Sequence, residues 1–105
     1  PVRRVIHAVG PVYRDGQSGE PELLRSAYTC SLALAEVEQL QSVAFPCIST
    51  GVYGYPPDAA CRLAVQAVRE WLTNHQHPRQ VTFCCFSAED EQLYLEQLRE
   101  IGWTP

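Results

Sequence analysis

The sequence has 105 residues, which is enough for one domain and too short for two. Its formal net charge of −4, from 12 acidic and 8 basic side chains, argues against nucleic-acid binding driven by phosphate neutralisation. No uncharged apolar run is long enough to span a bilayer, and no charged-then-apolar leader opens the chain. We therefore expect a single domain over residues 1–105, located in the cytoplasm and without a membrane partner.

The cysteines form no pattern that predicts a metal or redox site. They are odd in number and none belongs to a CxxC pair (Cys30, Cys47, Cys61, Cys84 and Cys85). His75 and His77 lie close together in a polar turn, but no cysteine stands near them at the spacing of zinc ligands. We therefore expect no bound metal and no cofactor.

The first part of the chain reads as a strand followed by a helix. Residues 2–9 are rich in β-branched side chains and end at Gly10-Pro11, which predicts a strand stopped by a turn. Apolar residues recur at helical spacing over residues 20–41, and Pro21 suits the first turn of a helix there.

The middle of the chain repeats this alternation. Residues 42–48 form a continuous apolar run, which is typical of a strand buried on both faces. Pro46 within it indicates that the strand ends or bulges there, because proline cannot donate to a ladder. Residues 57–74 carry one broad apolar face at helical spacing, and residues 80–86 are a third strand.

Ser87 is a candidate N-cap for a last helix that Gly102 would stop. The order β-α-β-α-β-α implies parallel strands with right-handed crossovers and helices on both faces, which is a three-layer α/β/α fold. Three strands are few for this class, and the chain opens directly on its first strand. We therefore expect that N-terminal strands of a larger sheet are missing.

The segment between the second strand and the second helix is Ile48-Ser49-Thr50-Gly51-Val52-Tyr53-Gly54-Tyr55-Pro56. Its two glycines allow a sharp turn that offers bare N–H groups, and the N-terminus of the next helix adds more. A strand, a glycine loop and a helix in succession often cradle phosphate. The loop matches neither Walker A nor GxGxxG. The residue types alone therefore leave two interpretations: a cradle for an anion such as a diphosphate, or an ordinary turn.

Two titratable side chains are candidate catalytic groups, and for each we favour a structural role. His7 lies in an apolar strand, where histidine is more often packed or hydrogen-bonded than a general base. Asp58 lies in the first turn of a helix, where an acid complements the helix dipole. The catalytic residue is therefore unknown from this sequence.

Three motifs together resemble the macrodomain family. The first is Val5-Ile6-His7-Ala8-Val9-Gly10-Pro11, and the second is Glu22-Leu23-Leu24 with Ala27-Tyr28. The third is Ala44-Phe45-Pro46 with the segment Ile48-Ser49-Thr50-Gly51-Val52-Tyr53-Gly54-Tyr55-Pro56 that follows it. The similarity spans nearly all of the chain and is strongest to the bacterial O-acetyl-ADP-ribose deacetylase branch, near the MacroD-type hydrolases. It implies a three-layer α/β/α fold that binds ADP-ribose. Only the C-terminal part of that domain is matched, and the family's Gly-rich catalytic loop has no counterpart in these residues.

The resemblance also implies which residues hold the ligand. In the family, the loop that matches Ser49, Thr50, Gly51, Val52, Tyr53 and Gly54 wraps the diphosphate with backbone N–H groups, and the aromatic at Tyr53 packs beside the distal ribose. The aromatic that matches Phe86, just after the last strand, stacks on the adenine. The alternative for Phe86 is ordinary packing in the core.

The resemblance leaves two functions open. The first is hydrolysis of an ester of ADP-ribose by the complete domain, either O-acetyl-ADP-ribose deacetylation or removal of mono-ADP-ribose from acidic side chains. The second is a non-catalytic reader that binds ADP-ribosylated proteins. The same loop serves both functions. A phosphatase of another class is disfavoured, because the chain has no Cys-x5-Arg loop and no DxD pair.

Overall fold

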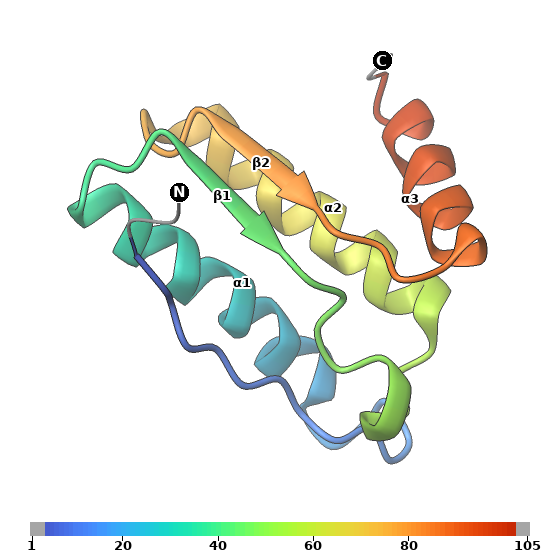
Figure 1. The fold of residues 1–105 in the computed structure, drawn as a ribbon. Helices are drawn as coiled ribbons and strands as arrows, with labels where there is room; N and C mark the ends of the chain where they lie inside the picture. Colours follow the sequence, from blue (N-terminus) through green and yellow to red (C-terminus); the bar gives the residue numbers. More distant parts are fainter. Residues whose placement is uncertain (1–3, 103–105) are drawn as a thin grey trace.

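The computed structural model describes residues 4–102, except for the side chain of Val52. The elements in chain order are α1 (Glu20–Val37), β1 (Ser42–Phe45), the short 3₁₀ helix η1 (Gly51–Tyr53), α2 (Pro57–Asn74), β2 (Gln80–Phe83) and α3 (Ala88–Glu100). Figure 1 shows the two strands side by side in front of α2, with α1 on the β1 side and α3 on the β2 side. Within residues 4–102, no helix has the length and apolar character that crossing a membrane requires.

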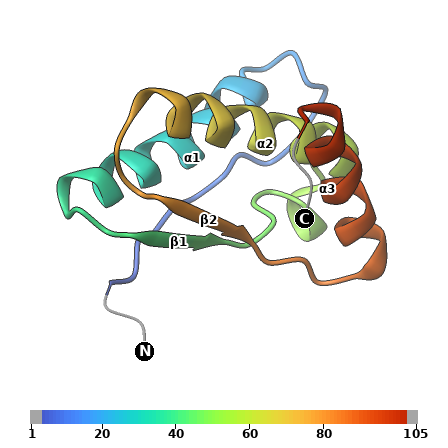
Figure 2. The same ribbon diagram turned by 90° about the horizontal axis from the view of Figure 1, so that it is seen from above.

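The two strands are parallel and are joined through α2, as the alternation predicts. Ser42 lies opposite Gln80, and Phe45 lies opposite Phe83. Since side chains alternate along a strand, the two phenylalanines point to one face of the sheet and Ser42 and Gln80 to the other. Figure 2 shows α1 and α2 on one side of the sheet. The other face carries only exposed residues (Ser42, Ala44, Gln80 and Thr82).

This burial pattern corrects one expectation. Residues 42–48 do not form a strand buried on both faces, because Ser42 and Ala44 are exposed and the strand already ends at Phe45. The described residues thus supply one helix layer and a sheet whose second face is uncovered.

The first expected strand is also absent. Residues 4–10 form no strand, and residues 2 and 3 of the predicted strand lie outside the described residues. Within residues 4–102, β1 pairs only with β2. Val5 and Val9 are 87% and 68% exposed. A strand is stabilised by pairing along a ladder, so this β-rich sequence remains irregular without a neighbouring strand.

The core lies between the helices and the covered face of the sheet. Tyr28 of α1 packs on Phe45 of β1 with ring centroids 4.9 Å apart, and Tyr94 of α3 packs on Phe83 of β2 at 4.8 Å. The face of α2 toward the core carries mostly small buried side chains, which let the neighbouring elements approach closely (Ala60, Cys61, Ala64, Val65, Ala67 and Val68).

The end of α1 differs from the predicted 20–41 because Gln39 adopts a left-handed backbone with φ 54°. The N–H of Gln39 donates to the carbonyl of Glu36 at 3.0 Å, and the N–H of Leu40 donates to that of Ala35 at 2.9 Å. This is the Schellman pattern that ends a helix, and its left-handed position is usually glycine. A glutamine there carries no such signal in the sequence.

The other helix ends follow their predictions. α2 spans Pro57–Asn74, as its apolar face indicated. The Ser87 hydroxyl caps α3 by accepting from the N–H of Asp90 at 3.1 Å. Gly102 follows the last turn with φ 87°, so it stops the helix as expected.

Candidate ligand site at the glycine loop

The glycine loop, residues 49–54, follows β1 at the carboxyl edge of the sheet. Pro46 comes directly after the strand, where it removes no donor from the β1–β2 ladder. Because β1 and β2 are parallel, β2 ends at the same edge, three residues before Phe86. Ligands of open α/β sheets bind outside this edge, so the architecture places the loop where a ligand is expected.

Both loop glycines have a backbone that other residues rarely adopt. Gly51 has φ 79° and Gly54 has φ 76°. A Cβ atom built on either residue would meet no heavy atom within 4 Å. The backbone is therefore left-handed and faces open space at both positions, which allows close approach of a ligand to the main chain.

Hydrogen bonds hold the loop by its carbonyl groups. The N–H of Tyr55 donates to the carbonyl of Ser49, and that of Gly54 donates to the carbonyl of Gly51, both at 3.0 Å. The Thr50 hydroxyl donates to the carbonyl of Cys47 at 3.1 Å. These bonds occupy acceptors, whereas the first N–H groups of a helical turn such as η1 have no partner within the turn. The loop therefore offers backbone donors, which suit an anion.

Ser49 contributes to the loop through its backbone. It is non-glycine but has φ 67°, and its hydroxyl is buried without a hydrogen-bond partner within the described residues. A Cβ atom on Gly10 would lie 2.1 Å from this hydroxyl oxygen and 2.5 Å from Ile48. Gly10 is therefore required for the loop to pack on the N-terminal segment, a role that the sequence analysis missed because Gly10 there marked only a turn.

A second support, also missed from the sequence, is the carboxylate of Glu20. It accepts four backbone N–H bonds of 2.7–3.1 Å from the segment before α1 (Arg14, Asp15, Gly16 and Ser18). The bonds from Arg14, Asp15 and Gly16, above all that of the Arg14 N–H, lower the pKa of Glu20 from 4.5 to about 2, although burial opposes the shift. Glu20 thereby orders the segment that follows Tyr13.

Tyr13 connects this ordered segment to the glycine loop. Its N–H donates to the carbonyl of Tyr53 at 2.8 Å, and its ring packs edge-on against Tyr55 with centroids 4.9 Å apart. The sequence Gly19-Glu20-Pro21 at the start of α1 was the signal from which the support by Glu20 could have been predicted.

The N-terminus of α2 offers fewer donors than expected. Pro56 is its N-cap and Pro57 its first residue, and neither has an N–H group. The N–H of Ala60 already donates to the carbonyl of Pro56 at 2.9 Å. Only the N–H groups of Asp58 and Ala59 remain from the first turn, and the exposed Asp58 carboxylate disfavours a second anion beside them.

Phe86 lies in the connection between β2 and α3 and is 83% exposed. This exposure rules out the alternative that Phe86 packs in the core. Tyr53, on the loop that follows β1, is 40% exposed. Both rings are therefore accessible, on segments that leave the sheet at the same edge, which is the arrangement that stacking on a ligand needs.

The titratable side chains near the loop are considered next as candidate catalytic groups and metal ligands. Cys47, two residues before Ser49, has its pKa raised to about 11, mainly by burial. Such a thiol is protonated at neutral pH and reacts poorly. His7 is exposed, so its side chain is not packed in the core, and a hydrogen bond as its structural role stays a prediction. Within residues 4–102, no group of three or more His, Cys, Asp or Glu side chains could hold a metal ion.

The fold and the loop define an α/β protein with left-handed glycines that face open space at the carboxyl edge of its parallel strands. A family model described as "Macro domain" matches residues 1–64, and the chain belongs to this family. It is 48% identical over 102 residues to the O-acetyl-ADP-ribose deacetylases of Escherichia fergusonii and Escherichia coli. These matches cover 97% of this chain but only 58% of the relatives, so the chain spans little more than half their length.

Solved macrodomain structures are also similar to this chain and also extend beyond the part that it matches. The Oceanobacillus iheyensis macrodomain, as a mutant with ADPR, matches with a TM-score of 0.84 and 36% identity, over 89% of this chain and 50% of the other. The Trypanosoma brucei macrodomain in complex with ADP matches with a TM-score of 0.76 and 37% identity, over 86% of this chain and 37% of the other. The expected family and α/β fold are thereby confirmed.

Proposed function

We propose that the glycine loop binds the diphosphate of ADP-ribose. The observation that carries this proposal is the pair Gly51 and Gly54, whose left-handed backbones face open space at the carboxyl edge of the sheet. Both phosphates of such a ligand are anionic acceptors, and the loop presents backbone donors while the carbonyl groups of Ser49, Gly51 and Tyr53 are already bonded. Exposed aromatic rings at Tyr53 and Phe86 are available for the ribose and the adenine.

The relatives support this ligand and suggest a reaction. Related structures contain ADPR or ADP, and the related sequences are named as O-acetyl-ADP-ribose deacetylases. The complete domain would hydrolyse an ester of ADP-ribose, either an acetyl ester or the linkage to an acidic protein side chain. The loop's share in this reaction is to fix the diphosphate and thereby position the distal ribose for attack by water.

The second candidate is a reader that binds ADP-ribosylated proteins without turnover. The glycine loop supports this function as well as hydrolysis, because backbone donors hold a diphosphate whether or not a reaction follows.

The binding test is calorimetric titration of ADP-ribose into the 105-residue chain, with circular dichroism to follow folding. Gly51→Glu should abolish binding, because its carboxylate would occupy the open space and repel the diphosphate. The matched control is Gly102→Glu, at a glycine with φ 87° and equally open surroundings outside the loop. Equal weakening by both variants, or a folded parent chain that binds no ADP-ribose, would contradict binding by this loop.

The catalytic test is release of acetate from O-acetyl-ADP-ribose, measured for the 105-residue chain and for the Escherichia coli relative as a positive control. We expect the chain alone to bind without releasing acetate. Release by the chain itself would contradict the requirement for the complete domain and would exclude the reader function.

A further inference from the structure

Two half-buried cysteines follow the two strands at the carboxyl edge of the sheet. β1 ends at Phe45 and β2 ends at Phe83, and these two residues lie opposite each other. Cys47 and Cys85 each come two residues later. The N–H of Cys84 still donates to the carbonyl of Phe45 at 2.7 Å, so the two segments remain side by side beyond the ends of the strands.

The side chains of Cys47 and Cys85 are in contact. Both pack against the core, and a hydrogen bond joins them. The Sγ atom of Cys47 also lies 3.6 Å from the carbonyl oxygen of Cys84. Neighbouring strands are about 4.8 Å apart, within the range of about 4.4–6.8 Å that a disulfide spans between Cα atoms. The two free thiols are therefore placed to form a disulfide, although no CxxC pair signals one in the sequence.

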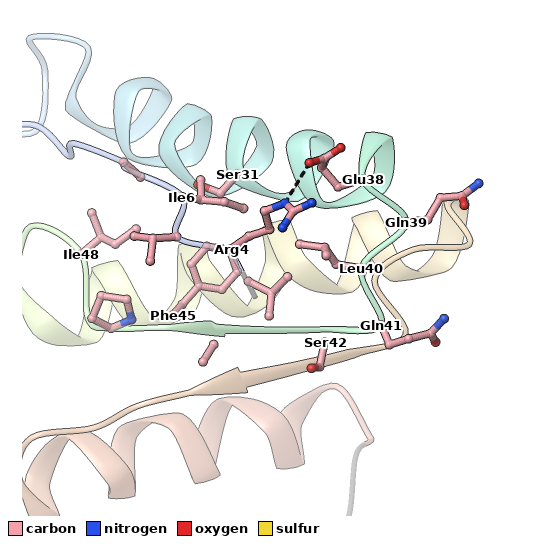
Figure 3. A pocket seen from close by; sticks show the side chains of 15 residues that line it. Arg4, Ile6, Ser31, Glu38, Gln39, Leu40, Gln41, Ser42, Phe45 and Ile48 are labelled. Carbon is pink, nitrogen blue, oxygen red and sulfur yellow. Dashed lines mark hydrogen bonds and ion pairs between the residues drawn. The ribbon is translucent and has the colours of Figure 1, made fainter. Parts of the chain in front are cut away.

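The surroundings of Cys47 leave room for the two sulfur atoms to come together. Figure 3 shows Phe45 and Ile48 beside a cavity of about 810 Å³ between the N-terminal segment and β1. Pro46 and Ile48, the two neighbours of Cys47 in the chain, line this cavity, whereas Cys47 does not. Dense packing on both sides of the segment would oppose a shift of its backbone. The cavity removes this opposition on one side.

The neighbouring cysteines are less suited to react with Cys47. Cys84 is exposed, and its contact with Cys47 is through its backbone carbonyl. Cys61 of α2 is only 1% exposed, and burial above all raises its pKa to about 12. An oxidant in solution therefore does not reach Cys61, and its thiol stays protonated.

We propose that Cys47 and Cys85 are an oxidation site, at which a hydroperoxide forms a disulfide between them. This disulfide would join the segment that leads into the glycine loop to the segment that carries Phe86. Its formation does not depend on which ligand the glycine loop binds.

The oxidation proceeds in two steps that balance. The Cys85 thiolate attacks one oxygen of the hydroperoxide, the O–O bond breaks, and the leaving alkoxide takes up a proton to become an alcohol. Cys85 is then a sulfenic acid. The sulfur of Cys47 attacks the sulfenic sulfur, the S–S bond forms, and hydroxide leaves as water with the proton of Cys47. Two thiols are thus oxidised by two electrons, and the hydroperoxide is reduced to an alcohol and water.

Cys85 is the thiol that reacts first. Burial above all raises the pKa of both thiols, to about 11 for Cys47, but the hydrogen bond between them lowers the pKa of Cys85 and raises that of Cys47. Further titratable groups act on the pair from α2, α3 and the β2–α3 connection (Cys61, Cys84, Asp90, Glu91 and Tyr94). Oxidation is therefore slow at neutral pH, and its rate should rise roughly tenfold per pH unit between about pH 7 and pH 8.5, as the thiolate fraction does.

The test treats the reduced 105-residue chain with hydrogen peroxide, blocks the remaining thiols by alkylation and maps disulfides by mass spectrometry. Chymotrypsin suits the mapping, since cleavage after Leu40 and Tyr53 separates Cys47 from the other cysteines. We expect Cys47 to be linked to the peptide that contains Cys85. The link closes a loop around α2 and β2, so it should also raise the thermal midpoint until dithiothreitol is added.

Matched variants decide which cysteine is the partner. Cys85→Ser and Cys47→Ser should each abolish the link, whereas Cys84→Ser should keep it, and circular dichroism checks that each variant is folded. The proposal is overturned if the folded chain forms no link over this pH range, if Cys84→Ser loses the link, or if Cys47 is joined to Cys61. A link that forms equally fast in chain unfolded by urea would also overturn it. ADP-ribose is not used, so these outcomes are separate from those of the binding test.

Discussion

At the scale of single residues, the glycine loop contains backbone conformations that cost free energy. Ser49 is left-handed despite its Cβ atom, and its buried hydroxyl has no partner within the described residues. Each feature destabilises the folded state by about 1–3 kcal/mol. Such costs concentrate at functional sites, where the surrounding structure holds the backbone in place. Here the carbonyl bonds of the loop and the contact with Gly10 do so.

Glu20 makes the stability of the chain depend on pH. Its folded-state pKa of about 2 lies below the ordinary value of 4.5, so its stabilisation is fully present above pH 4.5 and is lost as the pH falls toward 2. We expect Glu20→Gln to lower the thermal midpoint at pH 7 and to have little effect near pH 2. Thermal unfolding followed by circular dichroism across this range is the measurement.

The control for this prediction is Glu22→Gln, an exposed carboxylate in the same first turn of α1. It should change the midpoint little at any pH. An equal loss in both variants would mean that the helix dipole, rather than the four N–H bonds of Glu20, is responsible.

At the scale of elements, the helices were predicted well where local chemistry ends them. α3 begins after Ser87 and ends before Gly102, as expected. A capping hydroxyl and a left-handed glycine each end a helix through contacts within a few residues, which the sequence shows. The end of α1 was predicted four residues late, because Gln39 takes a conformation that its residue type does not favour.

Replacing Gln39 with glycine should therefore stabilise the chain. The left-handed conformation costs an L-residue about 1–2 kcal/mol, and glycine gives back about 0.5–1 kcal/mol through the flexibility of the unfolded chain. We expect Gln39→Gly to raise the free energy of unfolding by about 0.5–1 kcal/mol in urea denaturation. Gln41→Gly, close by but without a positive φ, should give no gain, and a gain of the same size there would contradict this explanation.

At the scale of the whole molecule, stability depends on one core on one side of a two-stranded sheet. The radius of gyration is 13.3 Å, close to the value of about 13 Å expected for a domain of this length. The chain is thus compact although, within residues 4–102, neither strand has a second strand partner and one face of the sheet is exposed. Each core side chain therefore carries a large share of the stability.

Leu32 of α1 tests this dependence, since it is fully buried. Leu32→Ala should lower the free energy of unfolding by about 2–5 kcal/mol, a large part of the roughly 5–15 kcal/mol typical of a domain. Leu34→Ala, two residues on and 53% exposed, should cost less than about 0.5 kcal/mol. Urea unfolding of both variants is the measurement, and similar costs would argue against a single core beneath α1.

The sequence by itself determined the family, the alternation of helices and strands from residue 20 onward, and the glycine loop, because these depend on local residue type and periodicity. The tertiary structure decided the features that depend on contacts with neighbouring strands and helices. Residues 4–10 remain irregular because no strand of the described part of the chain pairs with them, and one sheet face is exposed because no helix within residues 4–102 covers it. It also decided that Phe86 is exposed and that Gly10 supports the loop, since contacts between distant segments leave no local pattern.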